Sequence, residues 1–164
     1  MNAKIFLLAL ALLVSHAHAA SVFFGKVSYV TDGDTLWVQP EAGGRAQKLR
    51  IGGIDAPEIC QAGGEASRAV LARQVLHQRV EVRVSHKDVY GRGLANIRLN
   101  GQDVGAQMVL SGQAWSYRWQ RNPGPYAREE SEARQSRRGL FAESQPEVPG
   151  HFRKRHGSCY TRRR

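Results

Sequence analysis

The stretch from Arg50 to Glu58 places an arginine and two carboxylates within nine residues, and it constrains the fold more than any other part of the chain. An isoleucine leads through two glycines to a second isoleucine, which predicts a buried strand that bends just before Asp55. Pro57 lacks a backbone N–H and is expected to end the strand. Asp55 and Glu58 would then lie at a strand end, where a rigid scaffold presents side chains to a cleft. The same residues are common in ordinary turns, so this stretch alone also allows a purely structural turn.

The first nineteen residues have the features of a secretory signal peptide. Lys4 precedes an apolar run from Ile5 to Val14, and Ala17-His18-Ala19 has the small-x-small pattern of a cleavage site. The apolar run is too short to span a bilayer. We therefore expect a signal peptide at residues 1–19, a mature chain that begins at Ala20, and a secreted or periplasmic location.

The length of 164 residues suits one domain with a substantial core and short additions at its ends. We expect this domain to occupy residues 20–143, and residues 144–164 to form an extended linker and a basic C-terminal tail. Charge supports the division, because six basic residues follow the last acidic one, Glu147. They are Arg153, Lys154, Arg155, Arg162, Arg163 and Arg164. A folded body with a basic end indicates a polyanionic partner, either nucleic acid or an anionic membrane surface.

Cys60 and Cys159 are the two cysteines of the chain. An oxidising exported compartment favours pairing them, so we expect a disulfide bond. His151 and His156 lie near Cys159 in the sequence, but their spacing fits no closed tetrahedral set. The basic residues around them would also repel a cation, so no metal cluster is expected in the tail.

Alternating apolar residues and turn signals predict five short strands and three helices. Asp32-Gly33, flanked by apolar stretches, predicts a hairpin between the first two strands. The helices are expected at Glu65 to His77, from an Asp103 cap to Ser111, and at Tyr126 to Arg137. The strands are expected at 22–30, 36–40, 49–55, 80–85 and 95–99. This order predicts an α+β fold, a five-stranded OB-fold barrel with three helices.

The apolar face of the first helix is expected to include two alanines, a valine and a leucine. These are Ala66, Ala69, Val70 and Leu76.

Two further patterns suggest ligand contacts. Arg92 lies between two glycines in a turn, where its planar fork of donors could bind phosphate, although turn arginines are often merely solvated. Trp115, Tyr117 and Trp119 alternate with a serine and an arginine. Such a stripe is typical of a core, but aromatic residues next to basic ones also form stacking platforms for bases.

Three segments together resemble the signature segments of the staphylococcal nuclease (thermonuclease) family. They are Thr31 to Thr35, Arg50 to Glu58, and Tyr90 to Ala95, in the family's order and at similar spacing. The resemblance covers roughly residues 22–141. It implies a calcium-dependent endonuclease that hydrolyses DNA and RNA and leaves 3′-phosphate ends.

The resemblance also implies roles for individual residues. Asp34 and Asp55 match the carboxylates that bind calcium, the backbone carbonyl of Ala56 completes the protein ligands, and Asp32 lies in the outer shell. Glu58 matches the candidate general base for the attacking water. Arg50 and Arg92 match the pair that clamps the scissile phosphate. The aromatic residues do not align cleanly with the family's two tyrosines, so we expect Tyr117, together with Tyr90, to contact the nucleotide and Trp119 to contribute a weaker contact. Two carboxylates and a carbonyl leave coordination positions for water and phosphate, which calcium tolerates.

One departure from the family concerns the segment after Glu58. Only Ile59 to Gly64 stand where the best-known member has a long lysine-rich loop, so its phosphate-binding lysines have no counterpart here.

A non-catalytic nucleic-acid-binding module is the alternative function, and it would be indicated by missing acids or arginines. A cationic membrane-active protein would explain the tail but not the acidic cluster. We expect a monomer.

Overall fold

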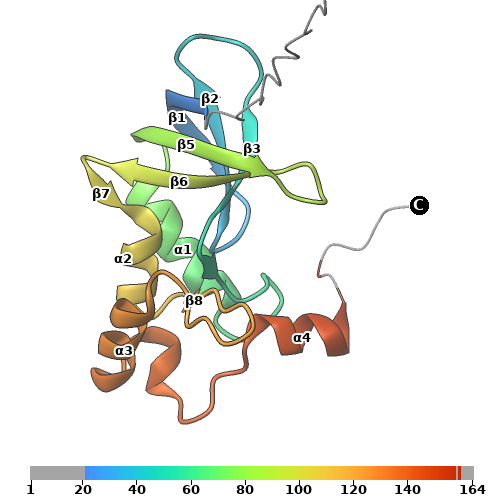
Figure 1. The fold of residues 1–164 in the computed structure, drawn as a ribbon, viewed down its shortest axis with the longest axis vertical. Coiled ribbons are helices and arrows are strands. Elements are labelled where there is room, and N and C mark those ends of the chain that lie inside the picture. Colours follow the sequence, from blue (N-terminus) through green and yellow to red (C-terminus); the bar gives the residue numbers. More distant parts are fainter. Residues whose placement is uncertain (1–20, 158, 160–164) are drawn as a thin grey trace, which may run out of the picture.

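Five strands form a closed barrel in the computed structural model, which describes residues 21–157 and residue 159 (Figure 1). The expected signal peptide lies outside the described residues, as do Arg162, Arg163 and Arg164. The barrel strands are β1 (Ser21–Val30), β2 (Thr35–Pro40), β3 (Gln47–Ile51), β5 (Arg79–Lys87) and β6 (Gly93–Leu99). They pair antiparallel in the order β3-β2-β1-β5-β6, and a parallel pairing of β3 with β6 closes the barrel. The predicted five-stranded α+β fold is therefore confirmed.

Short strands extend this framework. β7 (Gln102–Asp103) pairs with the end of β6, and β4 (Ile54–Asp55) pairs with β8 (Trp115–Ser116). The chain bends between β3 and β4 at Gly53, whose φ of 78° is left-handed. A Cβ atom at this position would lie 2.6 Å from Pro125 Cγ, so a larger residue does not fit without rearrangement. The bend that the two glycines predict is thus required by packing as well as by backbone conformation.

The three predicted helices are present as α1 (Gly64–Val75), α2 (Val104–Leu110) and α3 (Ala127–Gln135), followed by a 3₁₀ turn, η1 (Gly139–Ala142). The Asp103 side chain caps α2 by accepting from the N–H of Ala106 at 3.0 Å. Among the described residues, none of the helices combines the length and the apolar character needed to cross a membrane.

The expectation of an extended linker and tail beyond residue 143 is wrong for residues 149–156. They form a fourth helix, α4 (Pro149–His156), which lies below the barrel in Figure 1. Pro149 suggested an extended segment, but proline at the first helical position already has the φ of a helix and loses no hydrogen bond. The basic residues of the last turn also interact favourably with the negative end of the helix dipole.

The buried face of α1 differs from the expected one. Leu71 and Val75 are fully buried one turn apart, together with Ser67, whereas Ala66 and Ala69 are exposed. Ser67 tolerates burial because its hydroxyl donates to the carbonyl of Gln113 at 2.8 Å. Because one position of the buried face is a hydrogen-bonded serine, the apolar residues of the sequence alone do not identify that face of α1.

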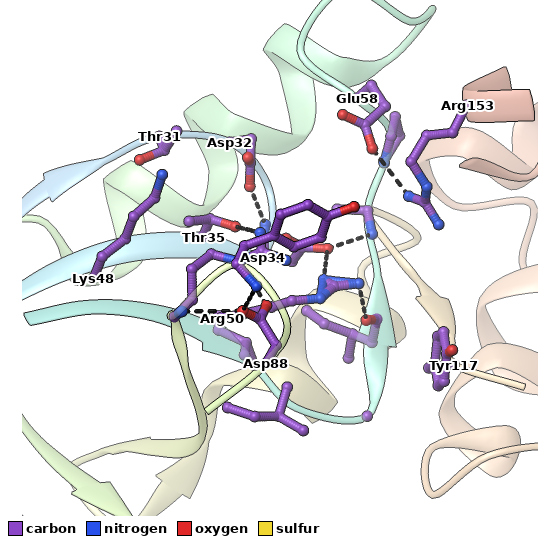
Figure 2. Close-up of a pocket in the computed structure, with 18 of the residues that line it drawn as sticks. Thr31, Asp32, Asp34, Thr35, Lys48, Arg50, Glu58, Asp88, Tyr117 and Arg153 are labelled. Atoms are coloured by element: carbon purple, nitrogen blue, oxygen red, sulfur yellow. Dashed lines mark hydrogen bonds and ion pairs between the residues drawn. The ribbon is translucent and has the colours of Figure 1, made fainter. Parts of the chain in front are cut away.

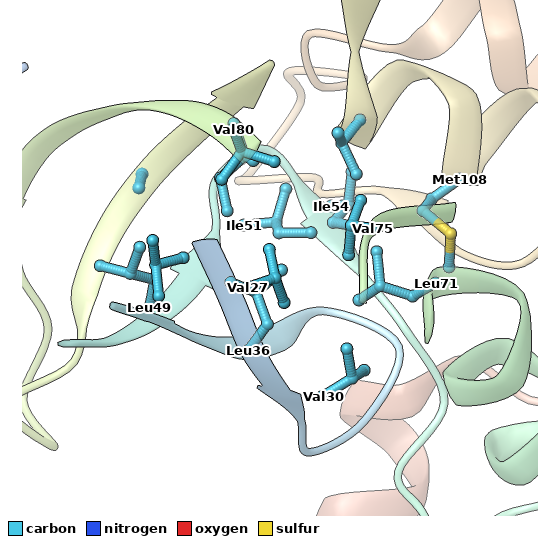
Figure 3. Close-up of a cluster of buried hydrophobic side chains, with 14 of the residues drawn as sticks. Val27, Val30, Leu36, Leu49, Ile51, Ile54, Leu71, Val75, Val80 and Met108 are labelled. Carbon is cyan, nitrogen blue, oxygen red and sulfur yellow. The ribbon is translucent and has the colours of Figure 1, made fainter. Parts of the chain in front are cut away.

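The core lies between the barrel strands and helices α1 and α2 (Figure 3). Leu49 and Ile51 of β3 are buried there, and each such side chain contributes roughly 1.5–3 kcal/mol of transfer free energy. Because successive residues of a strand point to opposite faces, Arg50 points away from this core. Burial of its two neighbours therefore fixes the position of Arg50 on the other face of β3.

Candidate active site

The three signature segments and α4 line one cleft of about 880 Å³ (Figure 2). Asp34 comes from the turn between β1 and β2, Arg50 from β3, and Arg92 from the loop between β5 and β6. Glu58 follows β4, and Arg153 enters from α4. Residues more than one hundred positions apart in the sequence thus share one site.

Arg50 joins two nearly buried carboxylates at the floor of the cleft. Its Nη1 lies 2.6 Å from Asp34 Oδ2, and its Nη2 lies 3.0 Å from Asp55 Oδ1. The exposed fractions of Asp34 and Asp55 are 6% and 5%. The N–H of Ala56 donates to Asp34 Oδ2 at 3.2 Å, which brings the turn after β1 against the segment after β4. The structure therefore brings together the carboxylates and the backbone residue that the sequence singled out.

Two carboxyl groups of the acidic cluster around Arg50 have raised pKa values. Burial, and next the charge of Asp34, raise the pKa of Asp32 to about 7. Burial also raises the pKa of Asp55, although the hydrogen bond and charge of Arg153 lower it in part. Burial thus favours the neutral form of these carboxyl groups, and a cation placed beside them would favour the charged form.

The donor set fits a hard, oxygen-preferring cation such as calcium. Within residues 21–157, no three acidic, histidine or cysteine side chains converge as a closed metal site requires. Two carboxylates and one backbone carbonyl form instead an open arrangement, and calcium accepts water or phosphate oxygens as its other ligands. Asp34, Asp55 and the carbonyl of Ala56 are the groups that could hold the ion.

Glu58 lies at the edge of the cleft, on a short loop anchored to the C-terminal segment. Its N–H donates to Gln61 Oε1 at 3.2 Å, and Gln61 Nε2 donates to the carbonyl of Glu147 at 2.6 Å. Cys60 and Cys159 form a disulfide in the same region. The short loop after Glu58 is therefore joined to the C-terminal segment at two adjacent positions, Cys60 and Gln61.

Arg92 is held in the cleft rather than merely solvated. Its Nε lies 2.8 Å from Asp88 Oδ2, and its Nη1 donates to Thr35 Oγ1 at 3.3 Å. Thr35 Oγ1 in turn donates to Asp34 Oδ1 at 2.9 Å. Thr35 thus links the arginine of one loop to the carboxylate of another.

The aromatic stripe divides into three environments. Trp115 is buried and packs edge-on against Phe141, with ring centroids 5.7 Å apart. Tyr117 is 42% exposed and lines the cleft, where its N–H donates to the carbonyl of Gly53 at 2.8 Å.

Trp119 is 67% exposed and is not among the cleft-lining residues, so its expected substrate contact is not supported. The reason is that Trp119 belongs to the loop beyond β8, where it forms a bridge with Asn122.

Tyr90 lies at the tip of the loop that carries Arg92 and lines the cleft while remaining 80% exposed. The guanidinium carbon of Arg92 lies 5.4 Å from the centroid of the tyrosine ring. This ring is placed to meet a ligand that enters the cleft.

Asp88 and Arg153 are site residues that the sequence interpretation missed. Asp88 precedes Arg92 by four residues, and an acid at this spacing from a candidate phosphate arginine could have been recognised as its partner. Arg153 gave no such signal, because its position depends on the unexpected helix α4.

Comparisons with known proteins relate the chain to nucleases. The model of the staphylococcal nuclease homologue family matches residues 48–143. An uncharacterized endonuclease of Haemophilus influenzae is 32% identical over 156 residues, which cover 94% of this chain and 87% of that protein. An uncharacterized endonuclease of Escherichia coli O157:H7 is 36% identical over 133 residues, or 80% and 85% of the two chains. A probable staphylococcal-like nuclease of Oryza sativa subsp. japonica, CAN2, is 34% identical over 110 residues, covering 67% of this chain and 30% of that protein.

Proposed function

The chain belongs to the family of staphylococcal nuclease homologues, and we propose that it is a calcium-dependent endonuclease that hydrolyses DNA and RNA and leaves 3′-phosphate ends. The observation that carries the proposal is the position of Arg50, whose guanidinium joins Asp34 and Asp55 in a cleft that also contains Glu58 and Arg92. A binding module without catalysis would not need two buried carboxylates beside a phosphate-binding arginine. The nuclease names of the relatives support the same reaction class.

Asp34, Asp55 and the carbonyl of Ala56 are proposed to hold the calcium ion. When bound, calcium would act as a Lewis acid on the phosphate and help to place the attacking water. Asp34 and Asp55 meet at one guanidinium and are both nearly buried, so their carboxylate oxygens lie close enough together to bind one divalent cation. Asp32 is proposed to act from outside the ligand set, since its carboxylate Oδ1 accepts from the N–H of Asp34 at 3.0 Å and so orients that segment.

Glu58 is proposed as the general base. Its carboxylate takes a proton from water as the water oxygen bonds to phosphorus, and the bond from phosphorus to the 5′ oxygen breaks. The departing oxygen is protonated by solvent, so one water molecule yields a 3′-phosphate and a 5′-hydroxyl. Glu58 is only partly buried at the edge of the cleft, where water has access to it.

Arg50 and Arg92 are proposed to stabilise the charge that builds on the phosphate oxygens. Guanidinium groups remain protonated at all relevant pH values, and they match phosphate with a planar fork of donors. Burial lowers the pKa of Arg50, but the charges of Asp34 and Asp55 outweigh this effect and raise it overall. Preorganised donors of this kind act most strongly where water is excluded.

The cleft aromatics are proposed to contact the nucleotide. Tyr117 and Tyr90 line the cleft and expose part of their rings, which suits stacking on a base without strong sequence preference. Trp119 is omitted from this proposal because it lies outside the cleft-lining set.

Export is a separate proposal, supported by the leader-like pattern at residues 1–19 and by the Cys60–Cys159 disulfide, which persists in oxidising compartments. We propose that the protein is a secreted or periplasmic monomer. N-terminal sequencing of the protein recovered from the periplasm or medium, together with light scattering, tests this, and a mature chain that retains Lys4 would contradict it.

Product analysis tests the proposed reaction. The purified protein is incubated with DNA and with RNA in ¹⁸O-labelled water, with calcium or with excess chelator. The expected products carry one ¹⁸O atom in a 3′-phosphate, and they form only with calcium. Full activity in chelator would contradict the metal, 5′-phosphate ends would contradict the bond assignment, and binding without cleavage would favour the non-catalytic alternative.

A further inference from the structure

Helix α4 delivers a third arginine to the cleft (Figure 2). Arg153 Nη1 lies 3.1 Å from Asp55 Oδ1 and 2.9 Å from Glu58 Oε1, and its Nη2 donates to Asp55 Oδ2 at 3.2 Å. Its guanidinium therefore spans a proposed metal ligand and the proposed general base. The family match ends at residue 143, so Arg153 is not part of the matched region.

The segment that carries Arg153 is fastened to the active-site loop on both sides of the helix. Before α4, Gln61 holds the carbonyl of Glu147 at 2.6 Å. After α4, Cys159 is bonded to Cys60, which lies two residues beyond Glu58. Arg155 also pairs with Glu147 and thereby joins α4 to the residues that precede it. The position of Arg153 is thus set by contacts with the loop that carries the general base.

We propose that Arg153 is a third substrate-phosphate ligand of the cleft, positioned by α4 and the Cys60–Cys159 disulfide. This inference rests on the proposed nuclease function and deepens it. Arg153 supplies the positive charge that the short loop lacks, since Ile59 to Gly64 contain neither lysine nor arginine. A phosphodiester that approaches Glu58 also meets the negative charge of Asp55, and a guanidinium between them offsets this repulsion.

The exposure of Arg153 suits a ligand that exchanges partners. Its side chain is 39% exposed, compared with 15% for that of Arg50. Arg50 is enclosed at the floor of the cleft, whereas Arg153 reaches the carboxylates from its rim. A partly solvated guanidinium can exchange a carboxylate oxygen for a phosphate oxygen, because both are anionic acceptors of similar geometry.

A different role would give the opposite kinetic result. If Arg153 only inhibited the enzyme, by neutralising Asp55 and Glu58 and blocking the cleft, its removal would raise activity. If it binds substrate, its removal weakens substrate binding and lowers activity. The sign of the effect distinguishes the two roles.

Arg153→Ala is compared with Lys154→Ala, which removes the same charge from the next position of α4. Lys154 lines a separate surface depression with Glu147 and His151 and does not line the cleft. We expect kcat/KM to fall on the order of ten- to a hundredfold in Arg153→Ala, mostly through KM, with partial recovery in Arg153→Lys. Lys154→Ala should change kcat/KM by less than about threefold. Higher activity in Arg153→Ala, or equal values in the two variants, would overturn the proposal.

A binding measurement keeps this inference separate from the nuclease proposal. The probe is a fluorescent single-stranded oligonucleotide whose bridging 5′ oxygens are replaced by methylene groups, so that the proposed scissile bond is absent. With calcium present, Arg153→Ala should reduce the slope of log affinity against log salt by about 0.7, the value for one phosphate contact, and Lys154→Ala should not. An unchanged slope in Arg153→Ala would overturn the phosphate contact. An inactive parent with the expected change in slope would overturn only the nuclease function.

The role of the disulfide is tested with Cys60→Ser/Cys159→Ser. Circular dichroism first establishes that the variant is folded under the assay conditions. This variant should resemble Arg153→Ala in KM, and adding Arg153→Ala to it should cause little further loss, because both changes remove the same contact. Full additivity of the two effects would show that the disulfide does not position Arg153.

Discussion

Asp88 and Arg92 hold each other through both backbone and side chain. The N–H of Arg92 donates to Asp88 Oδ1 at 3.0 Å, its Nε donates to Asp88 Oδ2 at 2.8 Å, and the N–H of Asp88 donates to the carbonyl of Arg92 at 2.8 Å. The same Oδ1 accepts from the N–H of Tyr90 at 2.9 Å. One carboxylate thus organises the loop that carries Arg92, a proposed phosphate ligand, and a tyrosine of the cleft.

Asp88→Ala is therefore expected to lower nuclease turnover by about tenfold or more, because Arg92 loses the partner that fixes its orientation. Calcium affinity should not change, since Asp88 lies outside the proposed ligands. Turnover by steady-state kinetics and calcium affinity by titration calorimetry measure the two effects. Glu41→Ala is the control, because it removes an exposed ion pair with Arg79 elsewhere on the barrel. Equal turnover in the two variants would show that Arg92 does not depend on Asp88.

Glu130 is expected to be important for stability. Its side chain is 2% exposed and accepts from Arg118 at 2.6 Å, from Arg134 at 2.7 Å and from the N–H of Ser116 at 2.9 Å. Glu130→Ala leaves that N–H buried without its acceptor and removes two charged hydrogen bonds, so unfolding should require about 2–3 kcal/mol less free energy. The arginines are partly exposed and can be solvated, which limits the loss.

Urea denaturation of the disulfide-intact protein measures this change. Glu132→Ala is the matched control on the same helix, because Glu132 is half-exposed in its pair with Arg138 and should contribute less than about 1 kcal/mol. A loss in Glu130→Ala no larger than in Glu132→Ala would contradict the structural role of Glu130.

The disulfide is expected to stabilise the folded protein as well as to position α4. Cys60 and Cys159 lie 99 positions apart in the sequence, and closing a loop of this size lowers the entropy of the unfolded chain. In the chain-entropy model the bond contributes up to about 4.7 kcal/mol, and native disulfides typically contribute about 2–5 kcal/mol. Denaturant unfolding of the parent and Cys60→Ser/Cys159→Ser gives the difference. Identical unfolding free energies would contradict this expectation.

The sequence was sufficient for the barrel because its signals are local. The alternation in β5 and β6, the turn at Asp32-Gly33 and the glycine bend at Gly53 all appear within a few residues and agree with one another. The candidate carboxylates and arginines followed from resemblance in three such segments. Their convergence in one cleft depends on the closure of the barrel by β3 and β6.

The remaining features depend on long-range packing that short patterns do not reveal. The inner face of α1 includes Ser67, whose burial requires the distant carbonyl of Gln113. Helix α4 begins at a proline that also suits an extended linker, and its docking depends on Gln61 and on the pairing of Cys60 with Cys159. Tyr117 and Trp119 look alike in sequence, but only Tyr117 belongs to the segment held against Gly53 at the cleft.

Glu58→Gln provides the most direct test of phosphodiester hydrolysis at this cleft. The glutamine retains an oxygen that can accept from Arg153 but cannot take a proton from water. Rates of cleavage of end-labelled DNA are measured for the parent with calcium, the parent in chelator, and the variant with calcium. We expect cleavage by the parent with calcium, none in chelator, and a variant at least about a hundredfold slower with nearly unchanged substrate affinity. Near-normal cleavage by Glu58→Gln would contradict the assignment of Glu58 as the base in this cleft.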